Sequence, residues 1–205
     1  PELFTPSFRL DLFFLGYKKG LRNHDGVSLE ERFGEFPDNL QDYVEWVKTW
    51  IIRKKNAGCV ALKIALAYER DLHFEKVTQE QAERVFRVKE SDITQEDIRY
   101  FQNYLFWKIC EIAAELSLPL QCHTGMGQIT NTNILQLNDV IKSNPDTKFV
   151  LLHCGFPWLD DLFPMVDGYQ NVYPDLTWVP LLSYTASNRV LHQLIEMSQI
   201  DKICW

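Results

Sequence analysis

The sequence predicts an α/β fold built on a parallel sheet. Segments typical of strands alternate with segments typical of helices along the 205 residues, and this alternation indicates βαβ units. The strands are largely apolar on both faces, as expected where helices cover both sides of a sheet. Two architectures satisfy these observations, a (β/α)8 barrel of the TIM type and an open doubly wound sheet. Neither a G-x-G-x-x-G nor a P-loop motif occurs, so dinucleotide and nucleotide sites of those types lack support.

The first half of the chain is predicted to hold a strand at 8–15, a helix at 37–58, a strand at 59–68, short helices around 79–89 and a helix at 94–116. FRLDLFFL is an apolar run of strand length. In the second segment apolar residues recur at three- and four-residue steps, which indicates an amphipathic helix, and Gly58 stands where its C-terminal cap belongs. CVALKIALAY is apolar on both faces apart from Lys63. Thr94 and Asp97 have the spacing of a capping box.

The second half continues the pattern with a strand at 118–124, a helix at 131–143, a strand at 148–154, a helix within 158–169, a strand at 171–178, a helix at 187–199 and the start of a strand at 202–205. Pro164 is expected to interrupt the helix in which it stands. The sequence stops at Trp205 in the middle of a predicted strand. We therefore expect residues 1–205 to be one domain that belongs to a longer chain.

Composition excludes several classes of function. The net charge is −7, whereas a nucleic-acid surface would show a basic stripe. No apolar run is long enough to cross a bilayer, and no cationic-then-apolar leader opens the sequence. We therefore expect a small-molecule substrate and no nucleic-acid or membrane partner, while self-association into a homo-oligomer stays open.

The cysteines indicate a reducing compartment. Their number is odd, no pair has C-x-x-C spacing, and each lies in an apolar stretch; they are Cys59, Cys110, Cys122, Cys154 and Cys204. This pattern favours free, buried thiols over a disulfide scaffold or a zinc finger. The sequence thus predicts a cytoplasmic protein.

Two histidines end neighbouring predicted strands. LPLQCHTGMGQ places His123 at a strand end before a glycine-containing loop, and KFVLLHCGFP repeats the arrangement at His153. In parallel α/β folds the ligand site lies at the carboxyl ends of the strands, and consecutive strands are usually neighbours. We therefore expect both imidazoles on one rim, where they could share a metal ion or a substrate. Alternation along a strand turns Cys122 and Cys154 away from them.

Lys63 is a third candidate. It interrupts an otherwise apolar strand, and a lysine buried on two sides is unfavourable unless it is paired or functional. It precedes the His123 strand by one βα unit and could point into the same cavity. The alternative is that its long stem carries the ammonium outward between helices.

The ordered set of CVALKIALAY, LPLQCHTGMGQ, KFVLLHCGFP, NVYPDLTW and DKICW resembles the amidohydrolase superfamily, specifically its amidohydrolase-2 branch. The resemblance covers roughly residues 37–205. It is to the metal-dependent hydrolase domain that occurs alone or fused to glutamine-synthetase-like proteins. It implies a distorted (β/α)8 barrel with divalent metal at its mouth, zinc first and manganese or iron as alternatives.

The same resemblance implies roles for individual residues. His123 matches a metal ligand on the fifth strand of the barrel. His153 matches the sixth-strand histidine, which ligates metal in some members and acts on water or the transition state in others. Lys63 matches the region of a fourth-strand lysine that in some branches is carboxylated and bridges two metals, which makes it a candidate catalytic residue together with His153. Tyr68, Arg70 and Trp178 follow strand ends and are candidate substrate contacts, with Arg70 placed to clamp a carboxylate.

Two elements of the family pattern are missing from this sequence. No H-x-H pair occurs, and the sequence ends where a W-G-[ST]-D motif would begin. Both fit a truncated barrel that could be inactive by itself. The resemblance implies hydrolysis of an amide, lactone or ester by a metal-activated water. A metal-dependent decarboxylase on the same scaffold and a non-catalytic domain are the alternatives.

Overall fold

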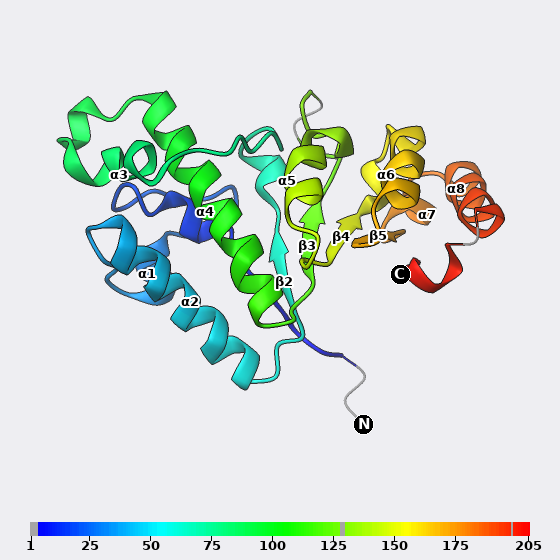
Figure 1. Cartoon of the computed structure of the whole chain (residues 1–205), viewed down its shortest axis with the longest axis horizontal. Helices are drawn as coiled ribbons and strands as arrows, with labels where there is room; N and C mark the ends of the chain where they lie inside the picture. Colours follow the sequence, from blue (N-terminus) through cyan, green and yellow to red (C-terminus); the bar gives the residue numbers. More distant parts are fainter. Residues whose placement is uncertain (1–3, 128–129, 198) are drawn as a thin grey trace.

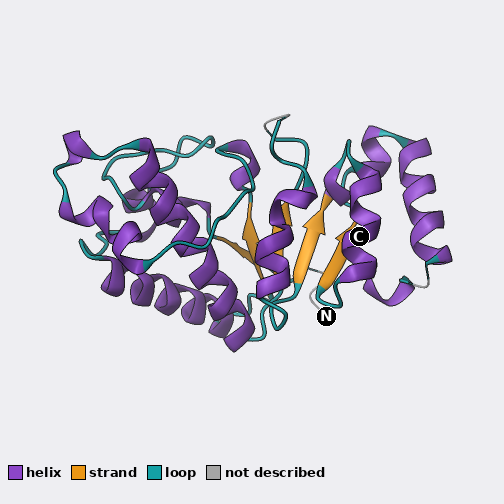
Figure 2. Ribbon diagram, turned by 45° about the horizontal axis from the view of Figure 1, so that its top comes forward, coloured by secondary structure: helices purple, strands orange, loops and turns teal. Residues whose placement is uncertain are grey.

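The framework of the molecule is one parallel sheet. The computed structural model describes residues 4–127, 130–197 and 199–205. Its strands are β1 (Ser7–Arg9), β2 (Ala61–Ile64), β3 (Leu120–His123), β4 (Phe149–Leu152) and β5 (Val172–Asp175). All neighbouring strands pair in parallel. Figure 2 shows the sheet in the middle of the molecule, with helices on either side.

The strand order decides between the two predicted architectures. A doubly wound sheet reverses its order at a switch point, whereas a (β/α)8 barrel adds each strand beside the previous one. The observed order β1-β2-β3-β4-β5 has no reversal. A parallel bridge between Asp175 and Cys204 continues it into the predicted strand at 202–205. Because β1 and β5 do not pair within the described residues, the strands form an open arc, and the prediction of an incomplete (β/α)8 barrel is confirmed.

The helices follow the strands in chain order and are α1 (Leu29–Phe33), α2 (Leu40–Asn56), α3 (Gln79–Arg87), α4 (Gln95–Glu115), α5 (Asn138–Ser143), α6 (Leu162–Gly168), α7 (Val179–Leu182) and α8 (Tyr184–Glu196). Figure 1 shows α1 to α4 at one end of the molecule and α6 to α8 at the other. Thr94 and Asp97 form the predicted capping box of α4. In the described part of the chain, no helix has the length and apolar character needed to cross a membrane.

The two faces of the sheet differ in polarity. One row of paired residues is apolar and buried: Phe8, Leu62, Leu120, Phe149 and Val172. Because side chains alternate along a strand, the next row lies on the opposite face. That row is largely polar and mostly half-buried: Arg9, Lys63, Gln121, Val150 and Tyr173. The predicted site residues Lys63 and His123 therefore share the second face.

All five described strands are shorter than the sequence predicts, and three of them differ most. The run at 8–15 contains only β1, which gives way to a 3-10 helix at Asp11–Leu15. The run at 59–68 likewise ends as a strand at Ile64 and continues as a 3-10 helix. Phe13, Phe14, Leu66 and Ala67 of these turns are still buried, so hydrophobicity alone did not reveal where extended backbone stops. The strand at 171–178 ends at Asp175.

Three predicted helices also differ in their bounds. Pro164 does not interrupt α6, because it is the third residue of the helix, and N–H groups in the first turn have no intrahelical partner to lose. The segment 131–143 is a 3-10 turn followed by α5 rather than one helix. The predicted helix at 187–199 begins earlier, after its N-cap Ser183. Residue 198 in that segment and residue 128 of the first histidine motif lie outside the described residues.

Candidate active site

The two strand-end histidines contact each other. His123 is the last residue of β3, and His153 directly follows β4. His153 Nε2 lies 3.3 Å from His123 Nδ1, and the ring centroids are 4.5 Å apart. Each residue is 2% exposed. The structure thus brings the two predicted metal ligands together at the carboxyl edge of the sheet.

An unusual backbone conformation makes this contact possible. In the strand register His123 is opposite Leu152, so regular alternation would turn the next residue, His153, to the other face of the sheet. Instead His153 and Cys154 adopt left-handed conformations, with φ values of 65° and 50°. Such conformations cost about 1–3 kcal/mol for residues other than glycine and cluster at functional sites. The backbone is therefore locally strained at His153 and Cys154, where it directs the His153 side chain toward His123.

Hydrogen bonds define which imidazole nitrogens carry lone pairs. His153 Nδ1 lies 2.7 Å from the carbonyl oxygen of Thr177, which can only accept, so Nδ1 carries the hydrogen and Nε2 presents a lone pair. His123 Nδ1 then donates to His153 Nε2. This leaves the lone pair on His123 Nε2, an atom that is buried and has no hydrogen-bond partner in the described structure.

Both imidazoles are neutral at physiological pH. Burial lowers the pKa of His123 to about 3, with further contributions from the charges of His153 and Lys63. Burial also lowers the pKa of His153, against the opposing effect of its hydrogen bond to Thr177. Neutral imidazoles have lone pairs available for a metal ion or a proton.

The donor set fits part of a metal site. Buried imidazole nitrogens suit zinc, manganese and iron, and a hydrogen bond from the far ring nitrogen to a backbone carbonyl is typical of metal-bound histidine. Burial raises the pKa of the Cys122 thiol to about 12, so it stays protonated and is no competing ligand. Within the described ranges, however, no group of three or more His, Cys, Asp and Glu side chains is arranged to hold a metal. The fit is therefore to two protein ligands, His123 and His153.

Lys63 lies on the same face of the sheet as His123. In the register it pairs with Gln121, two residues before His123 on the same strand. Its positive charge contributes to lowering the pKa of both histidines. The structure thus places the predicted catalytic lysine on the sheet face that carries His123 and not on the opposite face.

Two of the three predicted substrate contacts flank the histidines. The Tyr68 ring lies 4.5 Å from that of His123. The Trp178 ring stacks on His153 at 4.7 Å, with 14° between the planes. Both aromatic residues are partly solvent-exposed, at 36% for Tyr68 and 45% for Trp178. They form an apolar rim on either side of the imidazoles.

The third predicted contact, Arg70, is not placed at the histidines. Its guanidinium donates to the His73 carbonyl at 2.9 Å, to Asn103 Oδ1 at 3.0 Å and to Gln102 Oε1 at 3.1 Å. It also lies over the Phe74 ring. The donors that would clamp a substrate carboxylate are therefore engaged in tying the loop after β2 to α4.

Sequence reasoning missed Asp175 at this site. Asp175 ends β5 and is 4% exposed. Its Oδ1 accepts the Thr177 N–H at 2.8 Å, and the Thr177 carbonyl in turn accepts from His153. Asp175 therefore supports the orientation of His153 through one intervening residue. The strand-end rule that identified His123 would have found it had the strand been predicted to end at Asp175.

Asp11 was missed for the same reason. It lies just beyond the end of β1 but stood inside the predicted strand at 8–15. Its carboxylate is 2% exposed, accepts the Ala65 N–H at 2.6 Å and pairs with Arg9. Burial raises the pKa of Asp11, against the lowering effects of the Ala65 N–H and Arg9. It ties the ends of β1 and β2 together beside the site.

Comparisons with known proteins agree with this architecture. A family model described as amidohydrolase matches residues 31–205. Protein fluG of Emericella nidulans is 33% identical over 92 residues, which cover 42% of this chain and 11% of fluG.

Solved structures share the fold. A protein from Lactobacillus casei described as a metal-dependent hydrolase has a TM-score of 0.72 at 22% identity, over 94% of this chain and 48% of its own. Uronate isomerase from Thermotoga maritima has a TM-score of 0.67 at 19% identity, over 94% and 47% of the two chains. At this level of identity the similarity shows the fold alone. The chain spans about half the length of these structures.

Proposed function

This chain belongs to the amidohydrolase family, and from that premise we propose that it forms part of a metal-dependent hydrolase acting on an amide, lactone or ester bond of a small molecule. His123 and His153 would hold the divalent metal, with zinc as the first candidate and manganese or iron as alternatives. A bound ion of this kind supplies Lewis acidity and lowers the pKa of water.

One observation carries this proposal: the buried, unpartnered Nε2 of His123 beside His153 Nε2. A buried polar atom without a partner costs about 1–3 kcal/mol, so its presence at a strand end indicates a function in binding. The hydrogen bond to Thr177 fixes His153 in the tautomer that a metal ligand requires.

The remaining residues support the reaction in distinct ways. Where His153 does not ligate the metal, its Nε2 lone pair accepts or returns a proton in the proposed mechanism, because Nδ1 already carries the hydrogen that is bonded to Thr177. Lys63 stabilises negative charge on the substrate from the same sheet face. Tyr68 and Trp178 hold the body of the substrate and exclude water from its reacting bond.

A decarboxylase on the same scaffold is the second candidate. The observation in its favour is the positive charge of Lys63 near both histidines, because a basic site favours a carboxylate substrate. Release of carbon dioxide from carboxylic acids, measured beside hydrolysis of amides, lactones and esters, separates the two reactions. Absence of both reactions and of metal would favour a non-catalytic domain.

Metal content tests the proposal. We expect purified protein to carry about one equivalent or more of zinc, manganese or iron by plasma mass spectrometry. His123→Ala should lose most of it. His192→Ala removes an exposed histidine on α8 and serves as the matched control. Unchanged metal content in His123→Ala would overturn the ligand assignment.

A further inference from the structure

A row of polar side chains crosses the face of the sheet that carries His123. We name Arg9, Lys63, Gln121 and Tyr173 the polar row. Arg9 pairs in register with Lys63, and Lys63 with Gln121. Val150 separates Gln121 from Tyr173. Members of the polar row are half-buried, whereas the corresponding row on the opposite face is apolar and buried. The polar row is thus accessible and is not part of the core.

Arg9 and Lys63 differ in their partners. The Arg9 guanidinium binds Asp11, contacts Asp25 at 2.7 Å and lies 2.9 Å from His24 Nε2, so its charge is compensated. Lys63 has neither an ion pair nor a hydrogen bond with any residue that the structure describes, and the Gln121 side chain likewise has no hydrogen-bond partner there. A half-buried lysine and a half-buried glutamine therefore lie on adjacent strands, and no described residue accepts from their side-chain donors.

These donors lie close to the histidine pair. Gln121 precedes His123 by two residues on the same face, which corresponds to about 6–7 Å along the strand. Adjacent strands are about 4.8 Å apart, so Lys63 and Gln121 can reach the same small group. A ligand bound between them would extend toward His123 and His153.

We propose that Lys63 and Gln121 form an anion subsite that binds a carboxylate of the substrate next to the histidine pair. The ammonium supplies a charge-assisted hydrogen bond, and the amide N–H supplies a second donor from the neighbouring strand. An uncompensated cation repels a metal ion, so this subsite is distinct from the metal ligands. This subsite deepens the proposed function, because it names carboxylates as the substrate class. Binding of the carboxylate does not depend on the proposed function; only the reaction that follows binding rests on it.

Binding of benzoate and of its neutral analogue benzamide tests the anion subsite. Their planar rings can contact Tyr68 and Trp178 equally, so a difference in affinity reports the carboxylate. We expect the purified protein to bind benzoate at least about tenfold more tightly than benzamide in ligand-observed NMR titrations. Lys63→Met should bring the two affinities to within about twofold, while Lys63→Arg should retain most of the preference.

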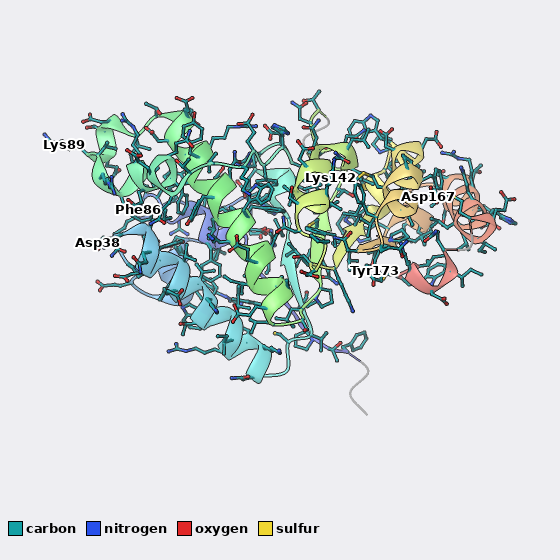
Figure 3. The ribbon with its side chains drawn as sticks, viewed as in Figure 1. Asp38, Phe86, Lys89, Lys142, Asp167 and Tyr173 are labelled. Carbon is teal, nitrogen blue, oxygen red and sulfur yellow. The ribbon has the colours of Figure 1, made fainter. Side chains whose placement is uncertain are left out.

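A matched control and a second variant complete the test. Lys142→Met removes an exposed lysine on α5, and Figure 3 shows Lys142 beside α5 and away from Tyr173 on the sheet. This control should leave the preference for benzoate unchanged. Gln121→Glu should reduce benzoate binding further than benzamide binding, because it adds a negative charge to the subsite.

Several results would overturn the inference. Equal affinity for benzoate and benzamide in the parent protein is one, and an equal loss in Lys142→Met and Lys63→Met is another. A ¹³C carbamate resonance on Lys63 after growth with labelled bicarbonate is a third, because a carboxylated lysine is an anion. Metal content is measured on every sample. A Lys63-dependent preference for benzoate in metal-free protein would support the subsite even if the hydrolase proposal fails.

Discussion

His153 donates its Nδ1–H to the carbonyl oxygen of Thr177, and this hydrogen bond is itself supported by Asp175. The Asp175 carboxylate accepts the Thr177 N–H, so the residue that accepts from His153 is held through its own backbone. A change at Asp175 should therefore affect the proposed metal site without altering either proposed ligand.

We predict that Asp175→Ala weakens zinc binding by about 10–100-fold, the range typical when a partner of a metal-bound histidine is removed. Asp175→Asn keeps an oxygen that can accept the Thr177 N–H and should retain affinity within a few-fold. Competition with a chromophoric chelator measures both. Equal affinity in the alanine variant and the parent would show that Thr177 is held by other contacts.

Gly125 and Gly155 follow the two histidines, and Gly125 sets the distance between their loops. Its φ is +60°, and a Cβ added there would lie 1.9 Å from the Phe156 carbonyl oxygen. Gly125→Ala should destabilise the fold by about 2 kcal/mol or more and reduce metal binding, because backbone must move. Thermal unfolding and metal content provide the two readouts.

Gly26→Ala is the control for backbone conformation alone. Gly26 has a φ of +75°, but a Cβ added there would have no other atom within 4 Å. The left-handed conformation should cost it about 1 kcal/mol, with no change in metal content. Equal effects of the two substitutions on metal content would mean that the contact between the histidine loops is unimportant.

The histidine pair should make the metal-free protein sensitive to acid. The pKa of His123 is about 3 when folded and near the ordinary 6.5 when unfolded, so the unfolded state binds more protons between these values. The contribution of His123 to the free energy of unfolding is therefore fully present above about pH 6.5 and is lost as the pH falls toward 3. Urea unfolding of chelator-treated protein at several pH values measures this slope, which should be shallower in His123→Gln. Identical slopes would contradict a buried, neutral His123.

Arg70 should behave as a structural residue. Its hydrogen bonds to His73 and Asn103 are largely shielded from solvent, and burial lowers its pKa to about 10. Arg70→Met should lower the free energy of unfolding by about 1–3 kcal/mol, because it leaves buried acceptors without a donor. Benzoate affinity, measured by the same NMR titration, should not change. Lost benzoate binding at unchanged stability would restore the substrate-clamp prediction.

The pattern of strands and helices predicted the sheet well because apolar runs and helical periodicity report burial directly. The same logic predicted that His123 and His153 share one edge. What it could not predict is the left-handed backbone at His153 and Cys154, since positive φ is uncommon for any residue other than glycine, even though histidine is enriched there. It also could not predict that Tyr68 contacts His123 whereas Arg70 does not. Both residues follow the same strand end, and only tertiary contacts show that the Arg70 side chain turns toward α4.

The contact between the two imidazoles also bears on how a metal would enter. Because each ring is already oriented, by Thr177 in one case and by its neighbour in the other, loading the site requires little ordering of side chains. The ring contact keeps the donors together before a ligand arrives. The affinity for a metal ion at such a preorganised site depends mainly on replacing the hydrogen bond between His123 and His153. The loss of side-chain conformational entropy on binding contributes far less.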